Sequence, residues 1–430
     1  MQRRDFLKLC GAAGLGFAAP VGLSSISHAE AAKSDLPAYG GPYYVVFNAA
    51  GGLDTTYLMD PKGVNEMNRL YKDGDIITEG NHRLAPNAAH IEAGMSNEDF
   101  FKKYGNELLV LNGLDYSVNN HAPCSRYIAT GKLDSLSYPT FAALVAACNG
   151  AEVPLAFLTF GNYSATGNLV PMARVPYLNS LTTLANADGV GGSARTRYHD
   201  DFVANRIERA LQDQIEARIS QVRLPRVERS QNMLFAAQLN SKALERVTPY
   251  VPKTSPKERL SRQADIVMAS FKAGVCVSAN LSIGQFDSHR NNDADQMRLI
   301  PEFLAGIDYL IKRAEELKIR EKLVVVIQSE MGRTPTYNQN DGKDHWSVGS
   351  IMFMGRGIKG NRVVGATDEK QFLVPVDPKS LSTDKENGIR VRPEHIHAAL
   401  RNLAGIETHD FSKQFPLKVP DEQKLKGFWG

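Results

Sequence analysis

The chain has 430 residues, 43% of them hydrophobic, which is enough for two domains or for one elaborated α/β domain with a large core. Its formal net charge is only +3, so there is no electrostatic reason to expect a nucleic-acid partner. The four cysteines include no close pair, and Cys10 lies in the leader, so no disulfide framework is readable.

Residues 1–29 have the pattern of an export signal. Arg3 and Arg4 precede a mildly apolar segment rich in Gly and Ala, and Ser27-His28-Ala29 ends it with small residues that a signal peptidase reads. A membrane anchor is the alternative, but this segment is weakly hydrophobic and is interrupted by Pro20. We therefore expect cleavage near Ala29 and export of a folded protein to the bacterial periplasm through the twin-arginine translocase, with no stable membrane anchor.

The first core strand is predicted over Tyr43–Phe47, a β-rich run that leads into a Gly-Gly turn and Asp54. Glycines after a strand allow a close approach of the backbone, and Asp54 would then lie at the carboxyl edge of the strand. Turn chemistry alone explains the same residues equally well. Residues 61–100 look irregular, and we expect His82 and His90 on the surface.

A second strand, over Glu107–Asn112, leads to a segment with several reactive side chains. His121, Cys124, Ser125 and Arg126 lie within a few residues of one another. Cys124 and Ser125 are candidate nucleophiles, and the planar fork of Arg126 suits an anionic oxygen. The alternative is a helix amino terminus capped by Ser125, whose backbone amides would still favour an anion.

The middle of the chain changes in character. A short helix and a strand come first, over 139–149 and 154–160, and a charged region with helical spacing follows. Leu211, Ile215 and Ile219 recur on one face of this region. Its helices are predicted over 200–224, 228–246 and 257–272. We assign residues 195–272 to a helical insertion packed beside the sheet, with its charges on a solvated face.

A strand over Gly274–Ile283 runs into Asp287 and His289. These two residues are two apart, so in extended structure both side chains lie on one face. Asp-x-His at a strand end predicts half of a metal site, against the alternative of a turn with a satisfied histidine. An amphipathic helix over 297–317 follows.

The stretch 323–360 contains the next strand-end candidates. An apolar run over Leu323–Ile327 reads as a buried strand with Glu330 after its end, and a Gly/Pro/Asn-rich loop then delivers Asp344 and His345 before a strand over 350–354. Open α/β sheets place their sites at the carboxyl ends of parallel strands, so Glu330 and His345 are candidates for one site. An edge strand is predicted over 372–376 and a helix over 393–403, on which His395 and His397 diverge.

The candidate side chains share the position expected for the carboxyl end of a strand. Three imidazoles with several carboxylates are typical for zinc, manganese or iron rather than for calcium alone. We therefore expect a divalent metal, zinc first, with manganese or calcium as alternatives. The predicted ligands are Asp54, His121, Asp287, His289, Glu330, Asp344 and His345.

At these residues the chain resembles the alkaline phosphatase and sulfatase superfamily, and most closely the twin-arginine-exported domain-of-unknown-function family 1501, over residues 43–406. Ser329-Glu330-Met331-Gly332 resembles the Ser-Asp-His-Gly or Ser-Asp-Asn-Gly of sulfatases. His345 precedes a strand that ends in Gly355-Arg356-Gly357, as in phosphatases. Asp54 resembles the first-strand aspartate that binds one metal, and Asp287 with His289 resembles the ligand pair of the other.

The resemblance implies a three-layer α/β sandwich with a mostly parallel central sheet over residues 40–430. It also implies an exported metal-dependent hydrolase or transferase that acts on phosphate or sulfate esters of a small molecule or a polymer. Arg126 would then steady the anion, and His121 would be a ligand or the nucleophile, with Cys124 and Ser125 as weaker nucleophile candidates.

Departures from the sulfatase pattern favour an alternative. His121 falls at the nucleophile position, Arg126 comes one residue late, and Met331 cannot replace a histidine ligand, so one metal site is altered or lost. The alternative is a non-catalytic periplasmic metal-binding protein, or an envelope assembly protein, that retains the fold.

Overall fold

The structure is a computed structural model that describes residues 37–430, apart from 162, 187–188, 191–195, 222–240 and 255. The predicted leader over 1–29 and much of the predicted helix over 228–246 therefore lie outside the described residues. Within the described part, no helix combines the length and the apolar composition that a bilayer-spanning segment needs.

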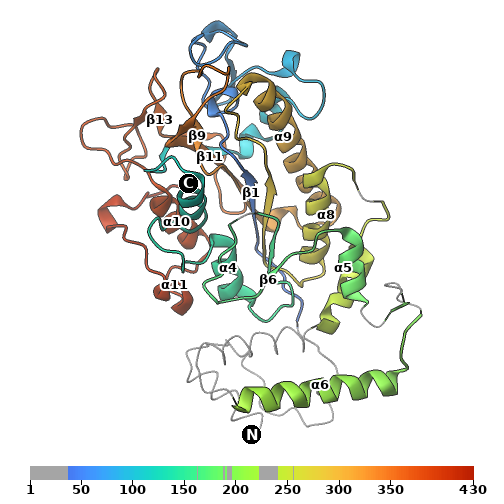
Figure 1. The fold of residues 1–430 in the computed structure, drawn as a ribbon. Helices are drawn as coiled ribbons and strands as arrows, with labels where there is room; N and C mark the ends of the chain where they lie inside the picture. Colours follow the sequence, from blue (N-terminus) through green and yellow to red (C-terminus); the bar gives the residue numbers. More distant parts are fainter. Residues whose placement is uncertain (1–36, 162, 187–188, 191–195, 222–240, 255) are drawn as a thin grey trace.

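An eight-stranded sheet forms the centre of the molecule (Figure 1), in the order β12-β4-β11-β8-β1-β7-β5-β6. All neighbouring strands are parallel except β11, which runs antiparallel to both β4 and β8. The mostly parallel sheet predicted from the sequence is therefore confirmed. Its strands are β1 (Tyr43–Ala49), β4 (Leu109–Asp115), β5 (Phe157–Thr159), β6 (Met172–Ala173), β7 (Ser278–Ile283), β8 (Leu323–Gln328), β11 (Val348–Gly355) and β12 (Arg362–Val364).

Helices cover both faces of the sheet, which gives the three layers that the resemblance implied. Alternate residues of β1 divide between two cores, because successive side chains of a strand point to opposite faces. Val45 and Phe47 pack with the first group of helices, and Tyr44 and Val46 pack with the second. The first group is α2 (Asn97–Tyr104), α8 (Arg259–Lys272) and α9 (Asn292–Glu316), and the second is α3 (His121–Thr130), α4 (Phe141–Gly150), α10 (Pro393–Leu403) and α11 (Asp410–Gln414).

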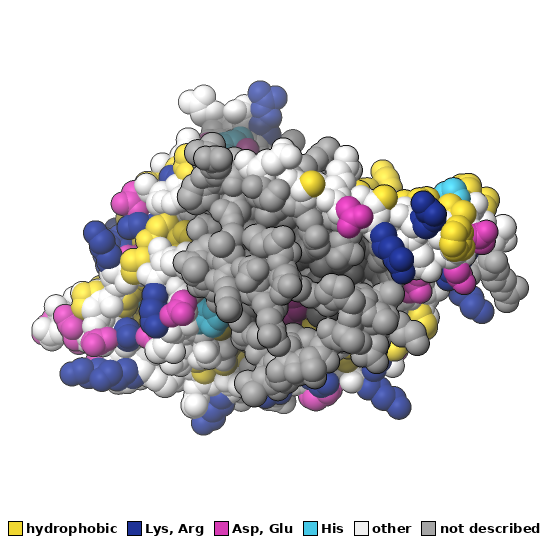
Figure 2. All heavy atoms as spheres, turned by 90° about the horizontal axis from the view of Figure 1, so that it is seen from below, with side chains coloured by type: hydrophobic (Ala, Val, Ile, Leu, Met, Phe, Trp, Pro, Cys, Tyr) yellow, Lys and Arg dark blue, Asp and Glu magenta, His cyan; other side chains and the backbone are white. Residues whose placement is uncertain are grey.

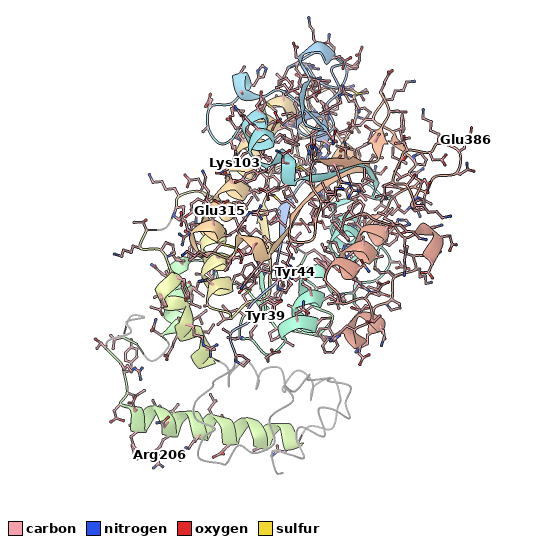
Figure 3. The ribbon with its side chains drawn as sticks, turned by 180° about the vertical axis from the view of Figure 1, so that it is seen from behind. Tyr39, Tyr44, Lys103, Arg206, Glu315 and Glu386 are labelled. Carbon is pink, nitrogen blue, oxygen red and sulfur yellow. The ribbon has the colours of Figure 1, made fainter. Side chains whose placement is uncertain are left out.

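The central strands end at one level. Asn48 of β1 pairs in register with Ser282 of β7 and with Gln328 of β8. Tyr39 and Tyr44 lie at the amino end of β1, toward the lower end of the molecule (Figure 3), so the carboxyl ends face the opposite way. The segments that follow these three strands therefore meet at one edge of the sheet.

The middle of the chain forms α5 (Leu178–Ala185), and the charged region after it forms α6 (Asp201–Gln221) and the 3₁₀ segment Ser241–Tyr250. Helix α6 lies below the sandwich in Figure 1, beyond the amino ends of the strands, and Arg206 lies on it in Figure 3. Seen from below (Figure 2), the described residues that surround the grey area mix hydrophobic, basic and acidic side chains. Helix α8, which the sequence places in the insertion, packs against β7 and α9 in the layer that covers the sheet.

Two expectations outside the site differ from the structure. His82 is 1% exposed, because β3 (His82–Leu84) pairs with β2 (Ile77–Glu79) and its ring contacts the Gly105 carbonyl and Phe101. The run over 372–376 is not an edge strand of the main sheet. Its strand β14 (Leu373–Val374) pairs with β13 (Ala366–Thr367) in a separate two-stranded sheet.

Candidate metal centre

Helix α3 brings His121 to the carboxyl edge of the sheet. The helix begins there because the side chain of Asn120 accepts a hydrogen bond from the Ala122 amide, and it ends at Gly131, which adopts φ +71°. The predicted helix terminus is confirmed, but its cap is Asn120. Ser125, the expected cap, lies inside the helix.

The loops after β1 and β7 pack tightly against each other. Gly51 and Gly52 have φ of +124° and +112°, where L side chains are strained. A Cβ atom on Gly51 would lie 2.4 Å from the Asp287 amide nitrogen, and one on Gly52 would lie 2.8 Å from the Arg333 side chain. The Gly-Gly pair therefore permits a close approach, as predicted, but its neighbours are protein atoms.

A short hairpin returns His345 to the end of β8. Strand β9 (Gly332–Arg333) pairs antiparallel with β10 (His345–Trp346), so Arg333 lies opposite His345. Gly342 in the connecting loop has the His289 backbone 2.0 Å from where its Cβ would be. The hairpin thus joins the segment after β8 to the segment after β7.

Three imidazoles and one carboxylate converge at this edge. The Nε2 atoms of His289 and His345 lie 3.0 Å apart, and they lie 3.2 and 3.3 Å from Oδ1 of Asp287. Nε2 of His121 lies 3.4 Å from Oδ2 of Asp287. Two ligands of one tetrahedral zinc, with bonds of about 2.0–2.1 Å, would be separated by about 3.3 Å. The spacing of these atoms therefore suits a single small divalent cation.

The other ring nitrogen of each histidine contacts an oxygen atom. Nδ1 of His121 lies 3.1 Å from Oε1 of Glu330, Nδ1 of His289 lies 2.8 Å from Oδ1 of Asp344, and Nδ1 of His345 lies 2.9 Å from the Asn119 carbonyl. Each Nδ1 therefore carries the proton and donates, which leaves the Nε2 lone pairs directed at Asp287. Two lone pairs only 3.0 Å apart require a proton or a cation between them, and Nε2 of His121 is buried without a hydrogen-bond partner.

The electrostatics of the centre favour an ionised Asp287. Burial alone would raise the pKa of Asp287, but the hydrogen bond and charge of Arg333, with His121 and His289, bring it below its ordinary value. The hydrogen bond to Glu330 raises the pKa of His121. The hydrogen bond to His289 lowers the pKa of the Asp344 carboxyl. The residues present thus fit a divalent cation. The ligand atoms of His121, Asp287 and His345 all lie within 4.8 Å of one another, and His289 lies beside this set, in contact with His345 and Asp287.

Glu330 and Asp344, both predicted as ligands, each place one oxygen against an Nδ1 atom, which is the position of a group that orients a ligand. Oε1 of Glu330 also accepts from the Gly51 amide at 2.7 Å. Both carboxylates orient imidazoles in the manner common around bound metals. Asp54 lies beyond the end of β1 and outside the cluster, in a buried ion pair with Lys343. The polar residue at the end of β1 is Asn48, whose amide oxygen accepts from Gln328 at 2.9 Å.

Sequence reasoning missed two buried basic residues. The Arg333 side chain is fully buried, and it donates to the carbonyls of Gly51, Gly52 and Lys343 and to Asp287. Lys343 is equally buried. In the sequence both residues lie in a polar loop, where charged side chains are usually exposed to solvent. Gly52, which makes room for the Arg333 side chain, was the available signal.

The remaining catalytic candidates lie beside the centre. Cys124 is fully buried, its thiol donates to the Val118 carbonyl at 3.2 Å, and burial raises its pKa to about 11, so it is a poor nucleophile. Ser125 faces a small cavity of about 50 Å³ that Glu330 also lines. Nε of Arg126 donates to the Leu133 carbonyl at 2.7 Å.

Solved structures of similar fold were found at low identity. A lipoteichoic acid synthase, LtaP, from Listeria monocytogenes has a TM-score of 0.41 and 8% identity over 90% of this chain and 76% of its own. A sulfatase from Pseudoalteromonas sp. has a TM-score of 0.40 and 12% identity over 90% and 72%. An alkaline phosphatase from the Antarctic bacterium TAB5 has a TM-score of 0.34 and 10% identity, over 85% of this chain and 99% of its own.

The sequence has no significant match among curated proteins. The model of the family described as "Protein of unknown function (DUF1501)" matches residues 44–415, which include every residue of the centre. The chain therefore belongs to the DUF1501 family.

Proposed function

We propose that the protein is an exported metal-dependent hydrolase or transferase that acts on phosphate or sulfate esters. The observation that supports this proposal is the common orientation of three imidazoles, whose Nδ1 atoms meet oxygen acceptors while their Nε2 atoms meet at Asp287. His121, Asp287, His289 and His345 would hold the cation, with zinc as the favoured metal and manganese or calcium as alternatives.

A cation bound there would polarise an ester oxygen and lower the pKa of a water molecule. The chain itself leaves the centre open to substrate, since the side chains of His121, His289 and Asp287 are 37%, 43% and 44% exposed. The amino end of α3 lies beside His121, and the partial positive charge of its amides favours an anionic ester.

Glu330 and Asp344 keep the Nδ1 protons of His121 and His289 in place, which maintains the Nε2 lone pairs for the cation. This arrangement favours His121 as a ligand over His121 as the nucleophile. Cys124 is fully buried, and Ser125 faces the neighbouring cavity, so we assign the attack to water.

The test is turnover by metal-loaded protein on a panel of aryl phosphates, phosphodiesters and aryl sulfates, with added zinc, manganese, magnesium or calcium. We expect turnover that a chelator abolishes and that His345→Ala removes, while Cys124→Ala and Ser125→Ala keep most of it. No turnover on any ester by protein that retains its metal would refute catalysis.

One observation favours a second candidate, a non-catalytic metal-binding protein of the periplasm or an envelope assembly protein. In the part of the chain that the structure describes, three basic side chains from the segments around the centre are already engaged. Arg333 and Lys343 are fully buried, and Arg126 donates to a backbone carbonyl. A protein that binds zinc tightly and hydrolyses no ester would fit this second function.

The export part of the proposal rests on the sequence of the leader. Arg3 and Arg4 occupy the positions that the twin-arginine machinery reads. Changing both to Lys should leave precursor in the cytoplasm, as shown by fractionation and immunoblotting. A normal periplasmic yield of the double variant would contradict export by this route.

A further inference from the structure

We propose that the centre takes one divalent cation only, because the ammonium group of Lys343 supplies the positive charge at Asp54 that a second metal would supply. This inference rests on the proposed function, since it specifies the number of metals in the same site. The strand-end pattern predicts Asp54 as a metal ligand, whereas the structure pairs it with Lys343.

The carboxylate of Asp54 is saturated by protein donors. Nζ of Lys343 lies 2.7 Å from Oδ2, and Nδ2 of Asn292 donates to the same oxygen at 3.0 Å. Oδ1 accepts from the amide of Thr56 at 3.2 Å and from its hydroxyl at 2.7 Å. Both charged side chains of the pair are 0% exposed. Each oxygen of Asp54 thus has two donors, and neither is free for a metal.

The surroundings of Lys343 suit an ammonium group. Its Nζ lies 5.4 Å from the ring centre of Tyr57 and 5.2 Å from that of Tyr337, and it also donates to the Met67 carbonyl. Aromatic faces at this range attract an organic cation. Both tyrosine hydroxyls donate to Oδ1 of Asp293 at 2.6 Å. Zinc would need ligand atoms at about 2.0–2.2 Å, and among the described residues none of the groups that hydrogen-bond to the Asp54 carboxylate is an imidazole.

The other position for a second metal is the end of β8, where sulfatase relatives carry an aspartate. There Glu330 offers a carboxylate, but its Oε1 already accepts from Gly51 and from His121. The neighbouring side chains are the amides of Asn48 and Gln328 and the thioether of Met331, none of which carries charge. Asp54 has no free oxygen and Glu330 keeps only Oε2, so neither position provides the set of several free, charged ligands that a second divalent cation needs.

The buried ion pair of Asp54 and Lys343 should also affect stability in a way that a metal site would not. Removing one partner of a buried ion pair leaves the other charged and unpaired, whereas replacing both with uncharged groups is far better tolerated. Lys343→Met alone should therefore lower the melting temperature of the metal-free protein, and Asp54→Asn in the same chain should recover much of the loss.

The experiment is metal analysis by mass spectrometry of protein purified without chelators and then equilibrated with excess zinc and desalted. We expect one zinc per chain for the parent, and still one for Asp54→Asn and for Asp54→Asn/Lys343→Met. Lys62→Met is the matched control, because Lys62 pairs with Asp60 at 2.9 Å elsewhere in the fold. It should keep one zinc and show no recovery on adding Asp54→Asn.

The outcomes separate this inference from the proposed function. Two zinc ions in the parent, or one fewer in Asp54→Asn than in the parent, would overturn the inference and leave the metal-dependent function standing. No zinc in the parent would overturn the function itself. A second zinc gained by Lys343→Met would support the inference directly, because it would show that the ammonium group is what excludes the second metal.

Discussion

Glu330→Gln tests whether this residue binds the cation or orients a ligand. Oε1 of Glu330 accepts from Nδ1 of His121 at 3.1 Å and from the Gly51 amide at 2.7 Å, and the residue is 8% exposed. Glutamine can place its carbonyl oxygen at the same point and keep both hydrogen bonds. The substitution therefore removes the negative charge and leaves the geometry.

The size of the effect follows from that difference. A charge-assisted hydrogen bond is roughly twice as strong as a neutral one, and loss of such a partner of a ligand histidine lowers metal affinity by about 10–100-fold. That range corresponds to about 1.4–2.7 kcal/mol of binding free energy. The metal-free fold should lose less than about 1 kcal/mol, since both donors keep an acceptor.

The assay is competition for zinc between metal-free protein and a chromophoric chelator at neutral pH, with His345→Ala measured beside it as a ligand deletion. Asp341→Asn is the control, because Asp341 lies in the loop between β9 and β10, is exposed and pairs with Arg69. Unchanged affinity in Glu330→Gln would refute the orienting role. A loss as large as that of His345→Ala would show that Glu330 is itself a ligand.

Three further predictions concern other parts of the molecule. Arg333→Lys should lower the free energy of unfolding by about 2–4 kcal/mol, because a lysine cannot reach three carbonyls and Asp287 at once. Urea unfolding measures this loss, and an unchanged urea midpoint would contradict it. The thiol of Cys124 should react with a maleimide reagent only after unfolding, and fast labelling of folded protein would contradict its burial. Burial raises the pKa of Glu394 from 4.5 to about 7, so its contribution to stability is present below the lower value and is lost as the pH rises through 7. Glu394→Gln should therefore stabilise the protein by about 2 kcal/mol above pH 7 relative to pH 5, and an equal effect at both would refute the shift.

The strands and the convergence of the imidazoles could be predicted from the sequence, because neither depends on how individual side chains are oriented. Runs such as 323–327 are too short and too apolar for anything but a buried strand, and β8 follows that run closely. Residues after parallel strands meet at one edge, which brings Asp287 and His289 to His345 once the sheet is formed.

Which carboxylates face the cation and which contact an imidazole Nδ1 could not be predicted. Whether Glu330 meets Nδ1 of His121 or a metal depends on how one ring is turned, and residue spacing does not contain that information. The pairing of Asp54 with Lys343 joins residues far apart in the chain, and each alone is indistinguishable from a surface charge. His82 was missed for the same reason, because its burial depends on a short hairpin whose strands are three residues each.

The position of β1 in the sheet has a consequence for how the chain is made. The strand starts the described fold, yet both of its neighbours come late: Tyr44 pairs with Ser278 and with Val324. Until the ribosome has synthesised β7 and β8, β1 has no strand to pair with. Its apolar side chains therefore stay unburied during most of synthesis. Contacts this distant in sequence form slowly and leave unpaired strands exposed to aggregation. The nascent protein should therefore depend on chaperones, and truncations that end before Gln328 should be insoluble.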